Sequence, residues 1–95
     1  MDPYEQFTRA QVMARDKYRC VLCNSPQIQI HEIVPRSRFG KLRSKILFDV
    51  KNRVCLCQMC HAEAHNYSHR KMLLDLLKTK YNYTYDEEEF QRYLN

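Results

Sequence analysis

The nine residues Cys57–His65 hold two cysteines and two histidines, side chains that commonly bind metals in proteins. Cys57 and Cys60 form a Cys-x-x-Cys turn, which can bind one zinc ion. His61 and His65 are four residues apart and would share one face of a helix. The cysteines need two further sulfurs for a tetrahedral site, and the histidines need a further ligand and an open position for a catalytic metal.

A second Cys-x-x-Cys pair, Cys20 and Cys23, supplies the missing sulfurs. The two pairs predict one structural zinc site that closes the base of the long segment between Cys23 and Cys57. Burial of the cysteines as small apolar residues is the simpler alternative, which the matched spacing disfavours. The fifth cysteine, Cys55, is out of phase with its neighbours, and we expect it to be buried without binding metal.

Length and composition favour one small domain that depends on metal. The chain has 95 residues, of which 44% are hydrophobic, so its core is marginal without a metal or another cross-link. The sequence has no apolar stretch long enough to span a membrane, and the start, Met1 to Pro3, is unlike a secretory signal. We therefore expect a cytoplasmic protein, in which a reducing environment favours zinc over disulfides.

Positive charge is concentrated in one segment of the chain. The net charge is +5, and residues 36–53 contain seven basic residues and one acid, Asp49, so this segment carries +6 and the rest of the chain −1. Local positive charge of this kind is typical of a DNA-binding surface, and a solvated basic loop is the simpler alternative. The candidate phosphate-binding residues are Arg36, Arg38, Lys41, Arg43 and Lys45.

Apolar periodicity predicts two strands and a helix around these residues. Residues 27–34 alternate in polarity like a half-buried strand, which Pro35 would end. Arg53–Leu56 is predicted to form a second short strand that pairs with the first. A helix over residues 58–67 would follow it.

The flanks are predicted to be helical. Residues 2–16 open with a capping box, and their packing face would carry Tyr4, Phe7, Ala10, Gln11, Ala14 and Tyr18. Ser68 is expected to cap a helix over 69–81 with an inward-facing leucine stripe. A second capping-box pattern predicts a last helix over 86–94.

In order and spacing, these residues resemble the HNH endonuclease family. The resemblance is carried by Cys20-x-x-Cys23, the run His31-Glu32-Ile33-Val34-Pro35-Arg36-Ser37, Asn52, Cys57-x-x-Cys60-His61 and His65. It implies an α+β fold in which a two-stranded hairpin and a helix form a ββα core around a divalent metal, with a four-cysteine zinc site. The core would cover about 15–66, with helical flanks at 2–16 and 68–94, in a single domain 1–95.

The resemblance also implies a role for each site residue. His31, His61 and His65 fall where the family binds its catalytic metal, here Mg²⁺, Mn²⁺, Ni²⁺ or Zn²⁺. Asn52 falls on the central asparagine, which holds the metal loop by hydrogen bonds. The family usually places a water-activating histidine after the first metal ligand, and this chain has Glu32 there. Glu32 could act as the general base, bind the metal or be structural, and its place beside the metal ligands favours the first two.

These roles predict a metal-dependent DNA endonuclease that hydrolyses phosphodiester bonds by nicking or double-strand cleavage. The alternative is a non-catalytic zinc module that binds nucleic acid, which the glutamate would permit, and a third is a protein-interaction scaffold. DNA is the expected partner, with a homodimer or a larger phage packaging assembly as further partners and no membrane. The chain also resembles proteins encoded by phages or mobile elements, which implies the cytoplasm of a bacterial or phage-infected cell.

Overall fold

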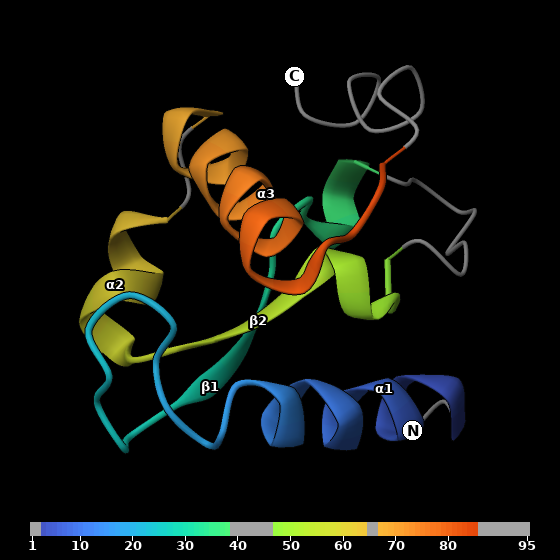
Figure 1. Ribbon diagram of the computed structural model, residues 1–95, viewed down its shortest axis with the longest axis horizontal. Helices are drawn as coiled ribbons and strands as arrows, with labels where there is room; N and C mark the ends of the chain where they lie inside the picture. The colour runs from blue at the N-terminus through green and yellow to red at the C-terminus, as the bar shows by residue number, and fades with distance from the viewer. Residues whose placement is uncertain (1–2, 39–46, 65–66, 86–95) are drawn as a thin grey trace.

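A two-stranded antiparallel hairpin lies between two helices (Figure 1). This computed structural model describes residues 3–38, 47–64 and 67–85, with the backbone alone described at Arg38, Tyr67 and Ser68. The elements in chain order are α1 (Pro3–Arg15), β1 (Gln29–Glu32), the 3-10 helices η1 (Arg36–Arg38) and η2 (Val50–Asn52), β2 (Arg53–Leu56), α2 (Gln58–Glu63) and α3 (Tyr67–Tyr81). The fold is therefore α+β, as the sequence predicts.

The hairpin confirms both predicted strands. β2 has the predicted bounds, and β1 is shorter than 27–34 because only four of its residues lie opposite β2. In this register His31 faces Val54 and Glu32 faces Arg53. Directly opposite residues point to the same side of a hairpin, and successive residues to opposite sides. Since Arg53 binds α1, Glu32 points toward the α1 side of the hairpin and His31 toward the other.

α1 confirms the predicted N-terminal helix, but the predicted packing face is wrong. Phe7, on that predicted face, is 61% exposed. The buried residues of α1 are Glu5, Thr8 and Val12. The reason is Arg53, which is 1% exposed and donates to a Glu5 carboxylate oxygen at 2.8 Å and to Thr8 Oγ1 at 3.1 Å. A buried guanidinium needs such partners, so its pairing fixes which face of α1 meets the hairpin.

The end of α1 is joined to β2 and α3 through an ion pair. Arg15 binds both carboxylate oxygens of Asp16, at 2.9 and 3.0 Å, and also donates to the Arg53 carbonyl at 2.6 Å. The buried Asp16 carboxylate accepts from the Cys55 backbone at 2.9 Å and from the Tyr81 hydroxyl at 2.8 Å. One acidic side chain therefore connects three elements of the fold.

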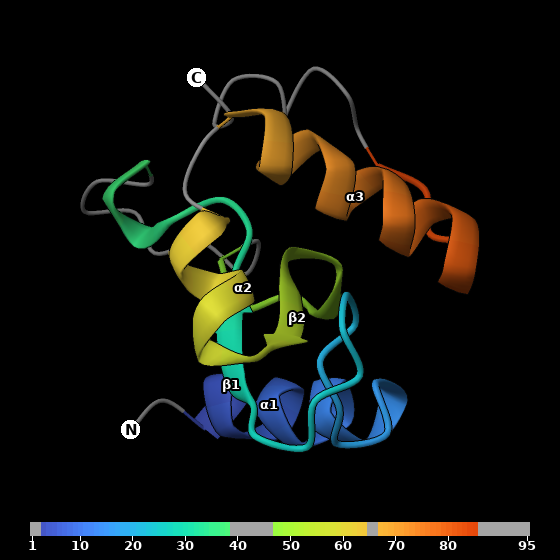
Figure 2. The same ribbon diagram turned by 90° about the vertical axis from the view of Figure 1, so that its left-hand side faces the viewer.

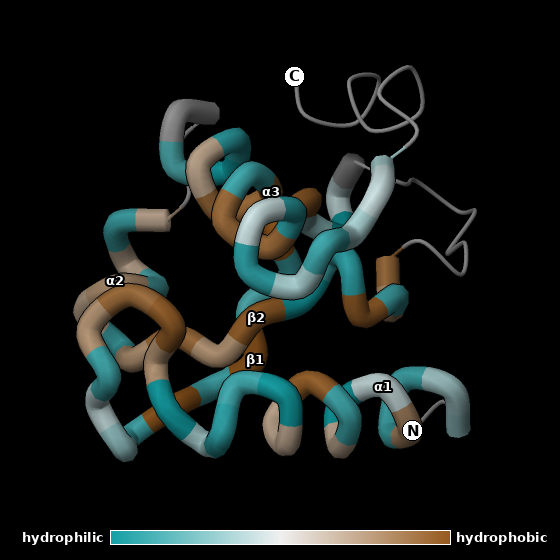
Figure 3. The backbone as a smooth tube through the Cα atoms, in the orientation of Figure 1, coloured by the Kyte–Doolittle hydropathy of each residue, from teal (hydrophilic) through white to brown (hydrophobic). Residues whose placement is uncertain are grey.

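The apolar core lies between β2 and α3, where the brown of hydrophobic residues is concentrated (Figure 3). Leu73 and Leu77 of the predicted leucine stripe are fully buried there. The helix begins at Tyr67, so Ser68 lies inside it and the predicted Ser68 cap is wrong. The predicted last helix, 86–94, lies outside the described residues.

α2 ends earlier than predicted. The helix expected over 58–67 stops at Glu63, where the Ala64 backbone donates to the His61 carbonyl at 3.2 Å. This three-residue hydrogen bond tightens the last turn and ends the helix. The helix of the predicted core is therefore short, and α3 begins almost directly after it.

Candidate metal centre and adjoining cleft

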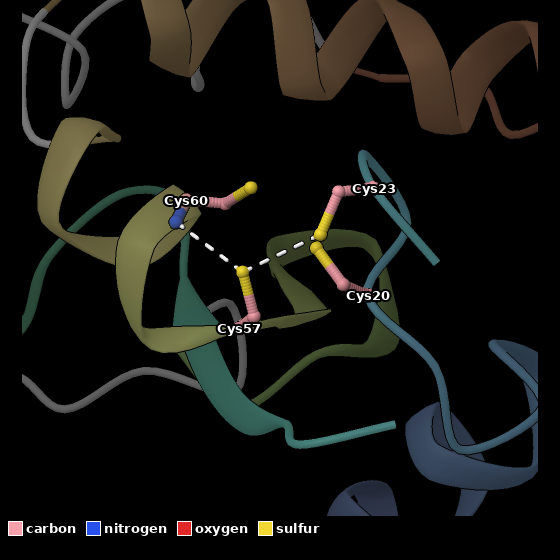
Figure 4. A group of neighbouring side chains, drawn as sticks. All are labelled: Cys20, Cys23, Cys57 and Cys60. Atoms are coloured by element: carbon pink, nitrogen blue, oxygen red, sulfur yellow. Dashed lines mark hydrogen bonds between the residues drawn. The ribbon is translucent and has the colours of Figure 1, made fainter. Parts of the chain in front are cut away.

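The four cysteines of the two predicted pairs meet at one point (Figure 4). Cys20 and Cys23 come from the turn after α1, and Cys57 and Cys60 from the start of α2. The four sulfur atoms all lie within 4.8 Å of one another, and Cys23 Sγ is 3.5 Å from Cys57 Sγ. Four sulfurs at zinc bonding distance in a tetrahedron would be about 3.8 Å apart. The cluster therefore fits a structural metal such as zinc.

Backbone N–H groups favour the thiolate form at two of the four cysteines, Cys20 and Cys57. Burial of the Cys20 thiol raises its pKa, but hydrogen bonds from the backbone of Cys57, Cys23 and Leu22 outweigh it and bring the pKa to about 7. The Cys60 backbone, whose N lies 3.4 Å from Cys57 Sγ, lowers the pKa of Cys57.

The pKa values of the other two thiols are raised. At Cys23 a hydrogen bond from the Ser25 backbone is outweighed by the neighbouring Cys57 and Cys20 side chains, and at Cys60 burial and the neighbouring thiols act together to raise the pKa. A bound cation would oppose this rise, since metals bind the thiolate form.

The first Cys-x-x-Cys turn is also tied to the hairpin. Its Cys20 carbonyl accepts from the Asn24 backbone at 2.9 Å, and Val21 N–H donates to the Cys55 carbonyl at 3.0 Å. Asn24 has φ 66°, a region that asparagine tolerates. Cys55 is fully buried, as predicted, and lies outside the sulfur cluster. Burial raises the pKa of its thiol to about 12.

Two of the predicted metal-binding histidines lie side by side. The rings of His31, on β1, and His61, on α2, have centroids 4.7 Å apart at an angle of 69°. His31 is 3% exposed, and His61 is half-buried. The third, His65, lies outside the described residues. Figure 2 shows why the two meet, because α2 lies directly beside β1.

These histidines line a cleft of about 230 Å³, which we call the histidine cleft. Its polar lining residues are His31, Glu32, Arg36, His61 and Arg70. Arg36 is one of the predicted phosphate-binding residues. The side chain of Arg38 is not described, and Lys41, Arg43 and Lys45 lie outside the described residues.

Arg70 is a cleft residue that the sequence did not indicate. It lies in the first turns of α3, one position after His69, and only the short connection from α2 brings it to the cleft. Helical periodicity marks the apolar face of α3 and says nothing about where its basic residues point. Arg70 and Arg36 therefore reach the same cleft from elements far apart in the sequence.

Glu32 also lines the histidine cleft, from the α1 side of β1, and its carboxyl group is half-buried. Burial raises its pKa above the ordinary value, and the positive charges of Arg53 and Arg36 oppose that rise without cancelling it. The group therefore holds a proton more readily than an exposed glutamate does. A base with a raised pKa is better matched to proton transfer near neutral pH.

Asn52 holds the chain that leaves β1 beside the cleft. Its side chain is fully buried, accepts from the Val34 backbone at 2.8 Å, and donates to the carbonyls of Val34 at 3.2 Å and Leu47 at 3.0 Å. Its own carbonyl accepts from Ile33 N–H at 2.8 Å. These hydrogen bonds tie the segment after β1 to the segment before η2.

Replacing Asn52 with alanine is expected to destabilise the protein. The change would leave one buried N–H and two buried carbonyls without their side-chain partner, a loss of roughly 2–4 kcal/mol. Urea unfolding of Asn52→Ala and the parent measures it. Asn52→Asp keeps the acceptor for Val34 N–H and should also be destabilised, because it loses both donors. A shift below about 0.5 kcal/mol in Asn52→Ala would contradict this role.

Comparisons of the chain with protein-family models, with curated proteins and with solved structures give no match. Within the part of the chain that the structure describes, no helix is long and apolar enough to cross a membrane. What the sulfur cluster and the histidine cleft can do therefore follows from their own residues.

Proposed function

We propose that the chain is a metal-dependent DNA endonuclease of the HNH type, which hydrolyses phosphodiester bonds. The observation that carries the proposal is the meeting of His31 and His61, with ring centroids 4.7 Å apart, in one cleft with Glu32. The histidines come from a hairpin and the helix that follows it, the order of a ββα core. Conversion of supercoiled plasmid to open circles in the presence of a divalent metal tests the proposal.

The cleft residues fit a divalent metal. His31 and His61, with His65, would hold Mg²⁺, Mn²⁺, Ni²⁺ or Zn²⁺. Such a metal, when bound, would supply positive charge that polarises the scissile phosphate and stabilises the leaving oxygen. Asn52 keeps the end of β1 in place beside these ligands.

The remaining steps follow from the protein side chains. Glu32 takes a proton from the attacking water while the new bond to phosphorus forms and the bond to the leaving oxygen breaks. Arg36 and Arg70 bind phosphate oxygens, since the planar guanidinium suits bidentate contacts. These arginines supply affinity and register without reading bases. The cleft thus combines a base, two phosphate binders and a metal site.

The pH dependence of nicking should identify the base. A general base acts in its deprotonated form, so the parent rate should rise with pH through a Glu32 pKa that lies above the ordinary carboxyl value. In Glu32→His the rise in rate should move to the pKa of an imidazole, about 6.5, and the activity should be kept or increased. Glu32→Gln cannot accept the proton and should lose at least about 100-fold in rate.

Plasmid nicking between about pH 5 and 8 measures these profiles. A Glu32→Gln variant as active as the parent would remove Glu32 from the mechanism. An inactive but folded Glu32→His variant would show that the carboxylate has an indispensable role that imidazole cannot take.

A non-catalytic zinc module that binds nucleic acid is the second candidate. It is favoured by the sulfur cluster and the cleft arginines, since neither depends on a histidine at position 32. If the protein binds DNA but nicks it with none of the four metals, this candidate is favoured.

A further inference from the structure

A second, larger hollow lies at the opposite end of α3 from Arg70. It has a volume of about 540 Å³ and is formed by the end of α1, the first Cys-x-x-Cys turn and the end of α3. Its charged lining residues are Arg15, Asp16, Lys17, Arg19 and Lys80. We call it the α1–α3 groove.

The net charge of the α1–α3 groove is strongly positive. Asp16 is the only acid among its described lining residues, and its buried carboxylate is bound by Arg15 and by the Tyr81 hydroxyl. The remaining charges belong to Lys17, Arg19 and Lys80, whose side chains are exposed. These three cations converge on one hollow with no acid left to balance them there. Such a surface attracts a polyanion.

The backbone at Lys17 gives a second, independent observation. Tyr18 N–H donates to the Met13 carbonyl at 2.9 Å and Lys17 N–H to the Ala14 carbonyl at 3.1 Å, which is a Schellman cap at the end of α1. Lys17 occupies its left-handed position, with φ 58°. Glycine is the usual residue there, and a residue with a Cβ costs roughly 1 kcal/mol more. The chain therefore holds a lysine that lines the groove at a position where stability alone favours glycine.

We infer that the α1–α3 groove is a second phosphate-binding site, which takes the backbone of a nucleic acid outside the histidine cleft. Lys17, Arg19 and Lys80 contact the phosphates and contribute affinity that does not depend on base sequence. The choice of nucleic acid as the polyanion rests on the proposed function. The groove itself does not, because none of its residues lines the histidine cleft.

The test uses Lys17→Gly, because this substitution separates stability from binding. Its thermal midpoint should equal or exceed that of the parent, since glycine suits the positive φ. Its affinity for a labelled DNA duplex, measured by fluorescence anisotropy without added divalent metal, should fall. The slope of log affinity against log salt should become shallower by about 0.9, the value for one lost phosphate contact. Lys80→Gln should reduce the slope similarly.

Asn82→Gly is the matched control. Asn82 also has a positive φ, 58°, but carries no charge and does not line the groove. This variant should bind DNA as the parent does. Parent-like affinity and slope in both Lys17→Gly and Lys80→Gln would overturn the inference, as would a protein that binds no duplex DNA. If the slope changes in a protein that never nicks plasmid, the phosphate-binding groove is supported and the nuclease proposal is rejected. If the slope is unchanged in a protein that does nick plasmid, only the groove proposal is rejected.

Discussion

Replacing Cys57 with serine is expected to unfold the protein. Cys57 Sγ joins the two halves of the sulfur cluster, 3.5 Å from Cys23 Sγ, and it caps α2 by accepting from the Cys60 backbone. Serine is itself a favourable N-cap, so the helix start is kept and only the metal ligand is lost. A structural zinc contributes about 10–16 kcal/mol in small zinc domains, which exceeds the stability of most domains of this size.

Circular dichroism and the zinc content of the purified variant measure this effect. Cys55→Ser is the matched control, because Cys55 is buried but lies outside the cluster. It should keep its zinc and melt cooperatively, with a loss of about 1–2 kcal/mol at most. If Cys57→Ser kept the zinc content and thermal midpoint of the parent, the four-cysteine site would be disproved.

Replacing His61 with alanine is expected to abolish nicking without unfolding the protein. His61 lies on α2 and is half-buried, and alanine is the best helix former, so the fold should tolerate the change. Replacing residues that only support metal ligands already lowers metal affinity or activity by about 10–100-fold. Loss of a ligand itself should lower the nicking rate by more than about 100-fold. Plasmid nicking with thermal melting of the same sample measures both effects.

His69→Ala controls for the removal of a histidine. His69 lies on α3 and does not line the histidine cleft, so its variant should nick at the parent rate. A His61→Ala variant that nicks like the parent would remove His61 from the site. A variant that loses its fold would show that the contact between the rings of His61 and His31 is structural.

The sulfur cluster and the strands were predictable because short-range spacing determines them. Two Cys-x-x-Cys pairs can close one tetrahedron in very few ways, and the cluster appears as predicted. β2 has the predicted bounds because Arg53–Leu56 is buried along its whole length and is followed directly by the Cys57 cap. Local chemistry was enough at both places.

The packing face of α1 was not predictable from periodicity. The predicted face was chosen by apolar periodicity. The buried Arg53 of β2 instead requires that Glu5 and Thr8 of α1 face the hairpin, because they bind its guanidinium group. The same limit applies to Arg70, whose place in the cleft depends on where α2 ends. The cap at Lys17 was also not predictable, because a lysine stands where glycine is the usual signal of a helix end. The packing face of α1 and the place of Arg70 depend on tertiary contacts that no single segment encodes, whereas the cap at Lys17 is local.

Plasmid nicking by the purified, zinc-loaded protein is the most direct test of the central claim. Supercoiled plasmid would be incubated with protein and Mg²⁺, Mn²⁺, Ni²⁺ or added Zn²⁺, and DNA binding would be measured in the same buffers. The proposed function predicts open circles with at least one metal, lost in His61→Ala while DNA binding remains. DNA binding without open circles under any of the four metals would contradict it.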